Sequence, residues 1–287
     1  MNHDSFIVRP GKKIRLKDHN PKFTGKFKDK EEAQVKLERD IETMAKYQDV
    51  LYAQDTLSLL IIFQAMDAAG KDGAIAHVMS GINPQGCQVY SFKSPTSEDL
   101  DHGYLWRCHK VMPERGRIGI FNRSYYEEVL VVRVHPEFLD SQRLPRHISR
   151  KKIWKDRFQD INDFERYAVR NGTHILKFFL NVSKDEQRRR FLDRINTPEK
   201  NWKFSIHDIE ERHHWDEYMK VYEDMFNHTS TKWAPWYIIP ADNKWFTRVA
   251  VANVITEKLK SLKLAYPTVT DAHRAELKKI KTMLESE

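Results

Sequence analysis

Residues 57–73 read Leu-Ser-Leu-Leu-Ile-Ile-Phe-Gln-Ala-Met-Asp-Ala-Ala-Gly-Lys-Asp-Gly, an apolar run that breaks into a glycine–lysine turn. The run predicts a buried strand, and the turn predicts a tight loop followed by a helix. A strand, loop and helix in this order form a phosphate cradle. The backbone N–H groups of the loop and the helix N-terminus point at the anion, and the lysine neutralises its charge.

This loop departs from the G-x-x-x-x-G-K-[ST] phosphate-binding pattern at two positions. Ala65 stands where the first glycine belongs, and Asp72 stands where a Ser or Thr would bind Mg²⁺. An acidic residue, Asp67, lies inside the loop instead. An ordinary strand-to-helix turn with an exposed lysine explains the same residues, so the loop alone leaves both interpretations open.

The composition is that of a basic globular protein. The chain of 287 residues is long enough for one large α/β domain or two small ones. Its net charge of +8 suggests an anionic partner, such as nucleic acid, a membrane surface or a phosphate-rich substrate. The two cysteines, Cys87 and Cys108, lack metal-ligand spacing and argue against a disulfide scaffold. Without a signal-peptide pattern or an apolar run near about 18 residues, we expect a soluble cytoplasmic protein with no membrane partner.

Short apolar runs alternate along the chain with segments of helical periodicity. There are five such runs, at 57–63, 87–92, 117–121, 174–182 and 236–239. Their alternation predicts crossover units and a parallel sheet covered by helices on both faces. The first helical segment, 31–53, carries a rough apolar stripe. Its members are Val35, Leu37, Ile41, Met44, Leu51 and Tyr52.

A second motif follows the third apolar run, in the sequence Ile118-Gly-Ile-Phe-Asn-Arg-Ser-Tyr-Tyr-Glu-Glu128. Asn122 and Arg123 stand at the carboxyl end of the predicted strand, where open α/β sheets bind ligands. Glu127 and Glu128 follow within about one helical turn. An arginine beside carboxylates can clamp a phosphate while a carboxylate holds Mg²⁺. A salt pair at the start of a helix explains this segment equally well.

Five segments occur in a fixed order, at 64–73, 121–128, 178–188, 201–204 and 233–242. In this order they resemble the second family of polyphosphate kinases, which move phosphoryl groups between inorganic polyphosphate and nucleotides. The resemblance extends over residues 35–262, nearly the whole of the expected folded part. One such motif would be weak, but five in order are specific.

The resemblance implies catalytic roles for Asp67, Lys71, Arg123, Glu127 and Glu128. Asp67 matches the acidic loop residue that handles metal and phosphate, and Lys71 matches the loop lysine. The implied metal is Mg²⁺, with Mn²⁺ as an alternative, and the expected ligands are Asp67 and Glu128. Asn122 stands where many family members carry a charged Asp. The residues expected to bind phosphate or nucleotide are Ala68, Ala69, Gly70, Asp72, Gly73, Asn122, Arg190, Arg194 and Lys203.

The implied reaction transfers a phosphoryl group from the end of polyphosphate to AMP or ADP, forming ADP or ATP, and runs in reverse. The Asn-Arg-Ser-x-Tyr-Glu pattern at 122–127 resembles the family branch that accepts AMP as well as ADP. Guanine nucleotides are left open as further substrates. We also expect a homo-oligomer, either a dimer or a tetramer.

Two basic segments lie outside the motifs of the loop and the strand end. Arg190 and Arg194 are four apart on one predicted helix face, and with the turn-rich residues after them they fit a lid over phosphates. A solvated basic face is the alternative. Residues 143–157 hold seven Lys and Arg in fifteen positions. They are interpreted either as a track for a long polyanion or as an exposed loop without a ligand.

We therefore expect a three-layer α/β/α sandwich with a five-stranded parallel sheet. It would be a P-loop fold of the nucleoside-monophosphate-kinase kind, with a helical lid at about 183–206. The expected division is an extended lead-in at 1–30, a phosphotransferase domain at 31–265 and a helical tail at 266–287. The alternatives are a nucleotide kinase that uses ATP as donor and a basic nucleic-acid-binding module.

Overall fold

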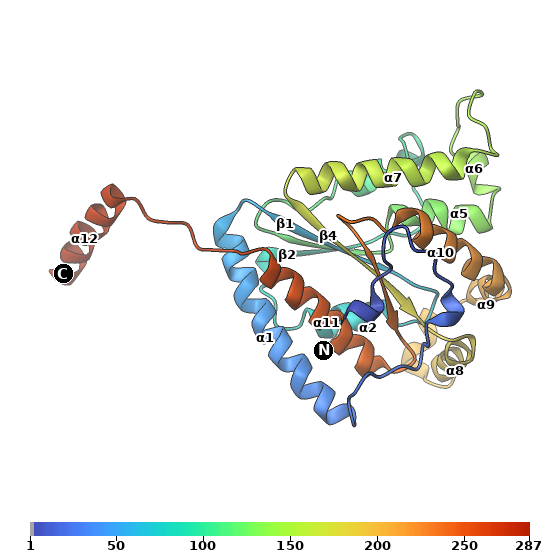
Figure 1. Cartoon of the computed structure of the whole chain (residues 1–287), viewed down its shortest axis with the longest axis horizontal. Helices are drawn as coiled ribbons and strands as arrows, with labels where there is room; N and C mark the ends of the chain where they lie inside the picture. Colours follow the sequence, from blue (N-terminus) through green and yellow to red (C-terminus); the bar gives the residue numbers. More distant parts are fainter. Residues whose placement is uncertain (1–2) are drawn as a thin grey trace.

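The computed structural model describes residues 3–287 and is built on one sheet of five parallel strands (Figure 1). The strand order across the sheet is β2-β3-β1-β4-β5. The strands are β1 (Ser58–Gln64), β2 (Cys87–Ser91), β3 (Ile118–Asn122), β4 (Thr173–Asn181) and β5 (Trp236–Pro240). The five predicted strands and their parallel arrangement are confirmed. Every residue of β1 is buried, which explains why this strand reads as an unbroken apolar run.

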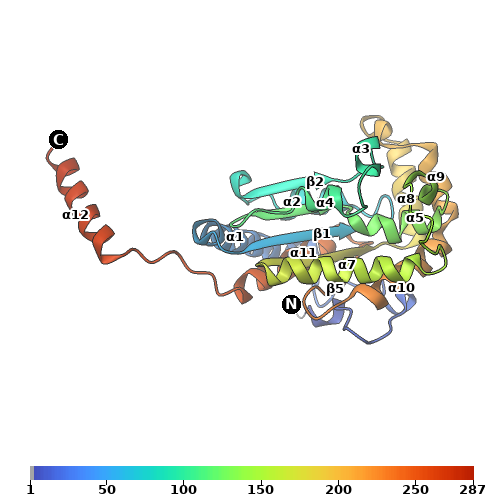
Figure 2. The same cartoon turned by 90° about the horizontal axis from the view of Figure 1, so that it is seen from above.

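Helices cover both faces of this sheet (Figures 1 and 2). One face carries α1 (Lys30–Gln54), α2 (Lys71–Val78) and α11 (Lys244–Ser261). The other carries α5 (Val131–Val134), α7 (Ile153–Arg170) and α10 (Trp215–Thr229). The predicted three-layer α/β/α architecture is therefore confirmed. In the predicted stripe of α1, Leu37, Met44 and Leu51 are buried, whereas Val35 and Tyr52 are exposed.

The carboxyl ends of the strands face a group of shorter segments. These are α3 (Ser97–Leu100), α4 (Trp106–His109), η4 (Tyr125–Val129), α6 (Phe138–Ser141), α8 (Lys184–Ile195), η5 (Pro198–Lys203) and α9 (Ile206–His213). The short helix η3 (Pro84–Gly86) lies at the opposite edge, directly before β2. Ser183 is the N-cap of helix α8, and its hydroxyl accepts from the Glu186 N–H at 3.1 Å. It ends before Pro198, as the sequence predicts. The expected lid thus consists of α8, η5 and their flanks, and its movement stays a prediction.

Residues 3–25 run across the open edge of β5 and are called here the N-terminal strap. The strap contains η1 (Asp4–Phe6) and η2 (Leu16–Asp18). Ile7 forms an antiparallel bridge with Tyr237, and the Val8 N–H donates to the Trp236 carbonyl at 2.8 Å. The described part of the expected lead-in therefore packs on the domain itself, while residues 1 and 2 lie outside the described range.

The C-terminal helix α12 (Asp271–Glu285) stands apart from the sheet and its covering helices (Figure 2). All of its residues are exposed, and the residues that connect it to α11 are without regular structure. A helical tail is found where one was expected, but the division into three parts remains a prediction. Across residues 3–287, no helix has both the length and the apolar character needed to cross a membrane.

Candidate active site

The loop between β1 and α2 is held in a strained conformation. Gly70, the N-cap of α2, has a φ of 103°, and Ala68 has a φ of 59°, in the left-handed region that side chains other than glycine rarely adopt. The Ala74 N–H donates to the Gly70 carbonyl at 2.9 Å. The N–H groups of the first helical residues, from Lys71 to Gly73, therefore have no acceptor within the helix. The loop has the polarity of an anion-binding helix start.

Lys71 turns inward from this loop rather than outward to solvent. Its side chain is buried, and its Nζ donates to the Ala65 carbonyl at 2.9 Å. Burial lowers the pKa of Lys71, and the negative charge of Asp67 opposes that shift. The lysine thus places a desolvated positive charge on the inner side of the loop.

Arg123 brings the second motif against the loop. Residue Asn122 at the end of β3 is paired with Phe63 in β1, and the Arg123 N–H donates to the Phe63 carbonyl at 3.0 Å. Its φ of 63° turns the chain sharply out of the strand. The Arg123 Nη2 lies 3.0 Å from Asp67 Oδ1, so the two predicted catalytic residues form an ion pair.

A second polar pair joins the same two elements. The Asn122 amide donates to Asp72 Oδ1 at 2.7 Å. Asp72 occupies the position where the phosphate-loop pattern has Ser or Thr. Asn122, at the end of β3, is thus uncharged, and the carboxylate of this pair belongs to Asp72 in the first turn of α2.

Arg190 on α8 binds the loop through backbone carbonyls. Its Nη1 donates to Ala68 and Ala69, at 3.0 and 2.7 Å, and its Nη2 donates to Ala241 and Asp242, at 2.5 and 3.0 Å. Its Nε donates to Glu186 at 2.7 Å. All five guanidinium hydrogens are used within the protein. In this conformation Arg190 therefore clamps the loop to the end of β5, and it has no N–H left for a phosphate.

The remaining predicted residues lie around the same cavity. Arg194, one turn beyond Arg190, is half-buried and its guanidinium lies 5.7 Å from the centre of the Phe191 ring. Lys203 ends η5, and its side chain lies outside what the structure describes. A cavity of about 840 Å³, called here the loop cavity, is lined by Asp67 to Ala74 and by Arg123, Arg190 and Arg194, among others.

Glu127 and Glu128, adjacent in sequence, lie in different surroundings. Burial raises the pKa of Glu127, while the positive charges of Arg123 and Lys71 oppose the rise. Glu128 is buried and binds elsewhere: its Oε1 accepts from Arg157 Nε at 3.0 Å and its Oε2 from the Gln142 amide at 2.8 Å. Burial also raises the pKa of Glu128, against the charge of Arg157. Glu128 lines the side cavity and Asp67 lines the loop cavity, and the metal role expected of Glu128 stays a prediction.

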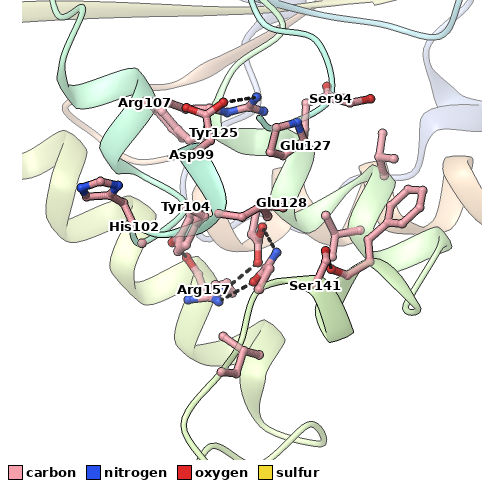
Figure 3. Close-up of a pocket in the computed structure, with 18 of the residues that line it drawn as sticks. Ser94, Asp99, His102, Tyr104, Arg107, Tyr125, Glu127, Glu128, Ser141 and Arg157 are labelled. Atoms are coloured by element: carbon pink, nitrogen blue, oxygen red, sulfur yellow. Dashed lines mark hydrogen bonds and ion pairs between the residues drawn. The ribbon is translucent and has the colours of Figure 1, made fainter. Parts of the chain in front are cut away.

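Glu128 and Arg157 form part of the wall of a second cavity of about 590 Å³, called here the side cavity (Figure 3). Tyr104 packs on this wall, with the Arg157 guanidinium 4.2 Å from the centre of its ring. Further apolar lining comes from Leu100, Val131, Val132, Phe138 and Leu144. Arg123 lines both the side cavity and the loop cavity, so it stands where the two meet.

A buried polar network supports the segment that follows Arg123. Lys177 on β4 and Glu165 on α7 are fully buried and form an ion pair of 2.7 Å. Glu165 Oε1 also accepts from the hydroxyls of Tyr125 and Tyr126, at 2.9 and 2.8 Å. Lys177 donates in addition to the Tyr126 hydroxyl and to the Thr229 carbonyl, both at 2.8 Å. Each of the three lysine hydrogens has an acceptor, so this network fixes η4 and the turn at Arg123.

Several residues of the loop cavity carry no motif signal in the sequence. Asp208 lies on its wall, and burial raises its pKa. From the sequence alone, Asp208 is recognisable only as the partner of Ser205 in a helix capping box. Lys93, Lys244 and Arg248 also line the cavity. The last two follow the end of β5 on α11, and their position after a strand end is the signal that reveals them.

The acidic residues of the loop suit a hard divalent cation. Asp67 Oδ1 accepts from Arg123, its Oδ2 has no hydrogen-bond partner among the described residues, and its side chain is 31% exposed. Mg²⁺ is commonly bound by one or two carboxylates together with substrate phosphates, rather than by a cage of side chains. Among residues 3–287 there is no cluster of three or more metal-ligating side chains. Asp67 fits a cation that shares its coordination with phosphates.

A buried strand, a phosphate-type loop with its lysine, and an arginine at the neighbouring strand end define a P-loop phosphotransferase of the nucleoside-monophosphate-kinase kind. The family model "Polyphosphate kinase 2 (PPK2)" matches residues 27–267. The chain belongs to the polyphosphate kinase 2 family.

Similar proteins and a similar crystal structure support membership of this family. The chain is 50% identical to the ADP-polyphosphate phosphotransferase of Rhodopseudomonas palustris, over 97% of each chain. It is 42% identical to the AMP/ADP-polyphosphate phosphotransferase of Meiothermus ruber, over 91% of this chain and 94% of the relative. The crystal structure of polyphosphate kinase 2 from Arthrobacter aurescens TC1 superimposes with a TM-score of 0.86, at 37% identity and over 96% of each chain.

Proposed function

We propose that this protein transfers a phosphoryl group from inorganic polyphosphate to AMP or ADP, and catalyses the reverse reaction. The observation that carries the proposal is the place of Arg123, which lines both cavities and is paired with Asp67 of the phosphate loop. A kinase needs a donor site and an acceptor site that meet at the phosphorus atom to be transferred. Arg123 stands at such a meeting point.

The two cavities differ in the ligand that they suit. The side cavity has apolar and aromatic walls, including Tyr104 and Phe138, and fits a nucleoside with its phosphate directed at Arg123. The loop cavity is lined by lysines and arginines from several elements and fits a chain of phosphates. We assign the nucleotide to the side cavity and polyphosphate to the loop cavity.

In this arrangement the protein acts by positioning and by neutralising charge. The N–H groups at the start of α2, with Lys71 behind them, hold the terminal phosphate of the donor. An oxygen of the acceptor phosphate forms a bond to that phosphorus atom, and the bond to the rest of the polyphosphate chain breaks. Arg123 neutralises charge on the group in transfer. Arg190 acts indirectly, by holding the carbonyls of Ala68 and Ala69 so that the loop keeps its shape.

The cofactor proposed is Mg²⁺, or alternatively Mn²⁺. Asp67 would hold it together with phosphate oxygens, and the ion would supply charge neutralisation between donor and acceptor. Asp72 and Asp208 also lie in the loop cavity, whereas Glu128 is engaged with Arg157. Of the two expected metal ligands, Asp67 and Glu128, we therefore propose Asp67 as the main one.

The acceptor range proposed is AMP and ADP, with guanine nucleotides to be tested. One relative is named for ADP alone and another for AMP and ADP, and the Asn-Arg-Ser-x-Tyr-Glu pattern favours the wider range. We further propose a cytoplasmic homo-oligomer, a dimer or a tetramer.

An assay without ATP tests the proposal. The protein is incubated with Mg²⁺ and polyphosphate, and with AMP, ADP, GMP or GDP in separate reactions, and the nucleotide products are separated by chromatography. We expect ADP and ATP to form. A protein that phosphorylates AMP only when ATP is supplied would be a conventional nucleotide kinase. A protein that binds RNA or DNA more tightly than polyphosphate, and transfers nothing, would be a nucleic-acid-binding module.

A further inference from the structure

Four cations that line the loop cavity have no carboxylate partner. They are Lys93, Arg194, Lys244 and Arg248, and none of them forms an ion pair with any residue in the range 3–287. By contrast, Lys200 on the same wall is paired with Asp193 at 3.1 Å. Unpaired cations grouped in one cavity repel each other, so their arrangement favours a bound polyanion.

Two of these cations form a pair on one helix face. Lys244 and Arg248 are four residues apart at the start of α11, which packs against α2 and begins near α8 (Figure 1). Arg248 is half-buried and has no hydrogen bond to any described residue. Burial lowers the pKa of both side chains. A partly desolvated guanidinium without a partner is costly unless an anion binds it.

The basic run at 143–157 lies outside the loop cavity, and part of its charge is paired. Arg143 is paired with Asp101, Arg150 with Asp140, and Arg157 with Glu128. Arg143 and Arg157 line the side cavity, where we place the nucleotide. Three of the seven cations in this run are therefore paired with carboxylates, and none of the seven lines the loop cavity.

We propose that Lys244 and Arg248 form a distal subsite for the polyphosphate chain, beyond the phosphate that reacts. The subsite rests on the proposed function and extends it: the polymer leaves the phosphate loop over the start of α11, not along residues 143–157. A long chain reaches the subsite, whereas a donor of three phosphates is held mainly at the loop. The pair thus selects long donors by affinity.

The test compares the double variant Lys244→Ala/Arg248→Ala with a charge-matched control, Lys278→Ala/Lys279→Ala, on the separate helix α12. Dissociation constants are measured by titration calorimetry for long polyphosphate, for tripolyphosphate and for ATP. We expect the ratio of the constant for long polyphosphate to that for tripolyphosphate to rise about tenfold in the double variant and not in the control. The slope of log affinity against log salt should fall by about two for the long chain, one for each cation removed.

Three outcomes would overturn the distal subsite. An equal loss of affinity for tripolyphosphate and for the long chain would place the pair at the reacting phosphate. Unchanged affinity for both donors would make the pair a solvated surface, and a rise in the ratio for Lys151→Ala/Lys152→Ala alone would direct the polymer along 143–157. Circular dichroism spectra confirm that the variants are folded. Because binding is measured without turnover, a protein that binds long chains at this subsite but transfers nothing would refute the proposed function and leave the subsite standing.

Discussion

Replacement of Arg190 by lysine is expected to destabilise the protein, although it keeps the charge. The guanidinium makes five hydrogen bonds, one to Glu186 and four to the carbonyls of two separate loops. A lysine has three N–H donors and no planar fork. At least two acceptors in this buried region are then left unpaired.

An unpaired buried acceptor costs about 1–3 kcal/mol, so Arg190→Lys should lower the free energy of unfolding by about 2–6 kcal/mol. In domains of about 150–250 residues, 1 kcal/mol changes the Tm by about 2–4 °C. The Tm should therefore fall by at least about 4 °C. Activity should also fall, because the carbonyls of Ala68 and Ala69 lose the group that fixes the loop.

Arg194→Lys is the matched control, because Arg194 lies on the same helix face, is half-buried and has no ion pair among the described residues. We expect its Tm to stay within about 1 °C of the parent protein while activity declines. Thermal unfolding followed by circular dichroism, together with the ATP-free assay, measures both effects. If Arg190→Lys unfolds at the same temperature as Arg194→Lys, the clamp assignment is refuted.

The other predictions concern the loop, the buried network and pH. Asp67→Asn should lower turnover about a thousandfold with little change in Tm, since it removes a charge from a partly exposed site; turnover within tenfold of the parent contradicts the metal role. Glu165→Gln should cost about 3 kcal/mol in urea unfolding, because Lys177 stays buried without its counter-charge; a cost below about 1 kcal/mol contradicts this. Burial lowers the pKa of His174 to about 4, so its neutral form is favoured in the folded state. Stability should be complete above the unfolded pKa of about 6.5 and fall as the pH drops from there to about 4, and His174→Gln should flatten this part of the profile. Urea unfolding at pH 7 and pH 5 provides the comparison, and identical losses in both proteins would contradict it.

The five strands could be predicted from the sequence because each buried strand leaves a short apolar run of neighbouring residues. The loop and Arg123 were readable for the same reason, since each follows a strand end. The sequence placed Arg190 on a helix near the site, but it did not predict which groups the guanidinium contacts. A charged residue on a helix face gives no sign that four carbonyls from the loops after β1 and β5 converge on it.

The contacts of Glu128 could not be predicted from the sequence either. Its distance from Arg123 along the chain suggested a shared metal site, yet the turn after β3 directs Glu128 to Arg157 on α7. Val35 and Tyr52 fit the helical stripe of α1, which packs against α11, yet both side chains are exposed. Contacts between distant segments decide these cases, and periodicity does not encode them.

The N-terminal strap has a consequence for the order in which the protein is assembled during synthesis. Its N–H groups at Ile14 and Leu16 donate to Asn227 and Glu223, and the Val8 carbonyl accepts from Ser230, across separations of 207 to 222 residues. At about 5–20 residues per second, a ribosome needs roughly 10–40 s to produce those partners after the strap has emerged. Throughout that interval the buried side chains of Phe6, Val8 and Leu16 lack the partners that β5, α10 and α11 supply. The strap is therefore among the first segments of the described chain to be made and among the last to be placed, and it is ready to cover the edge of β5 as soon as that strand forms.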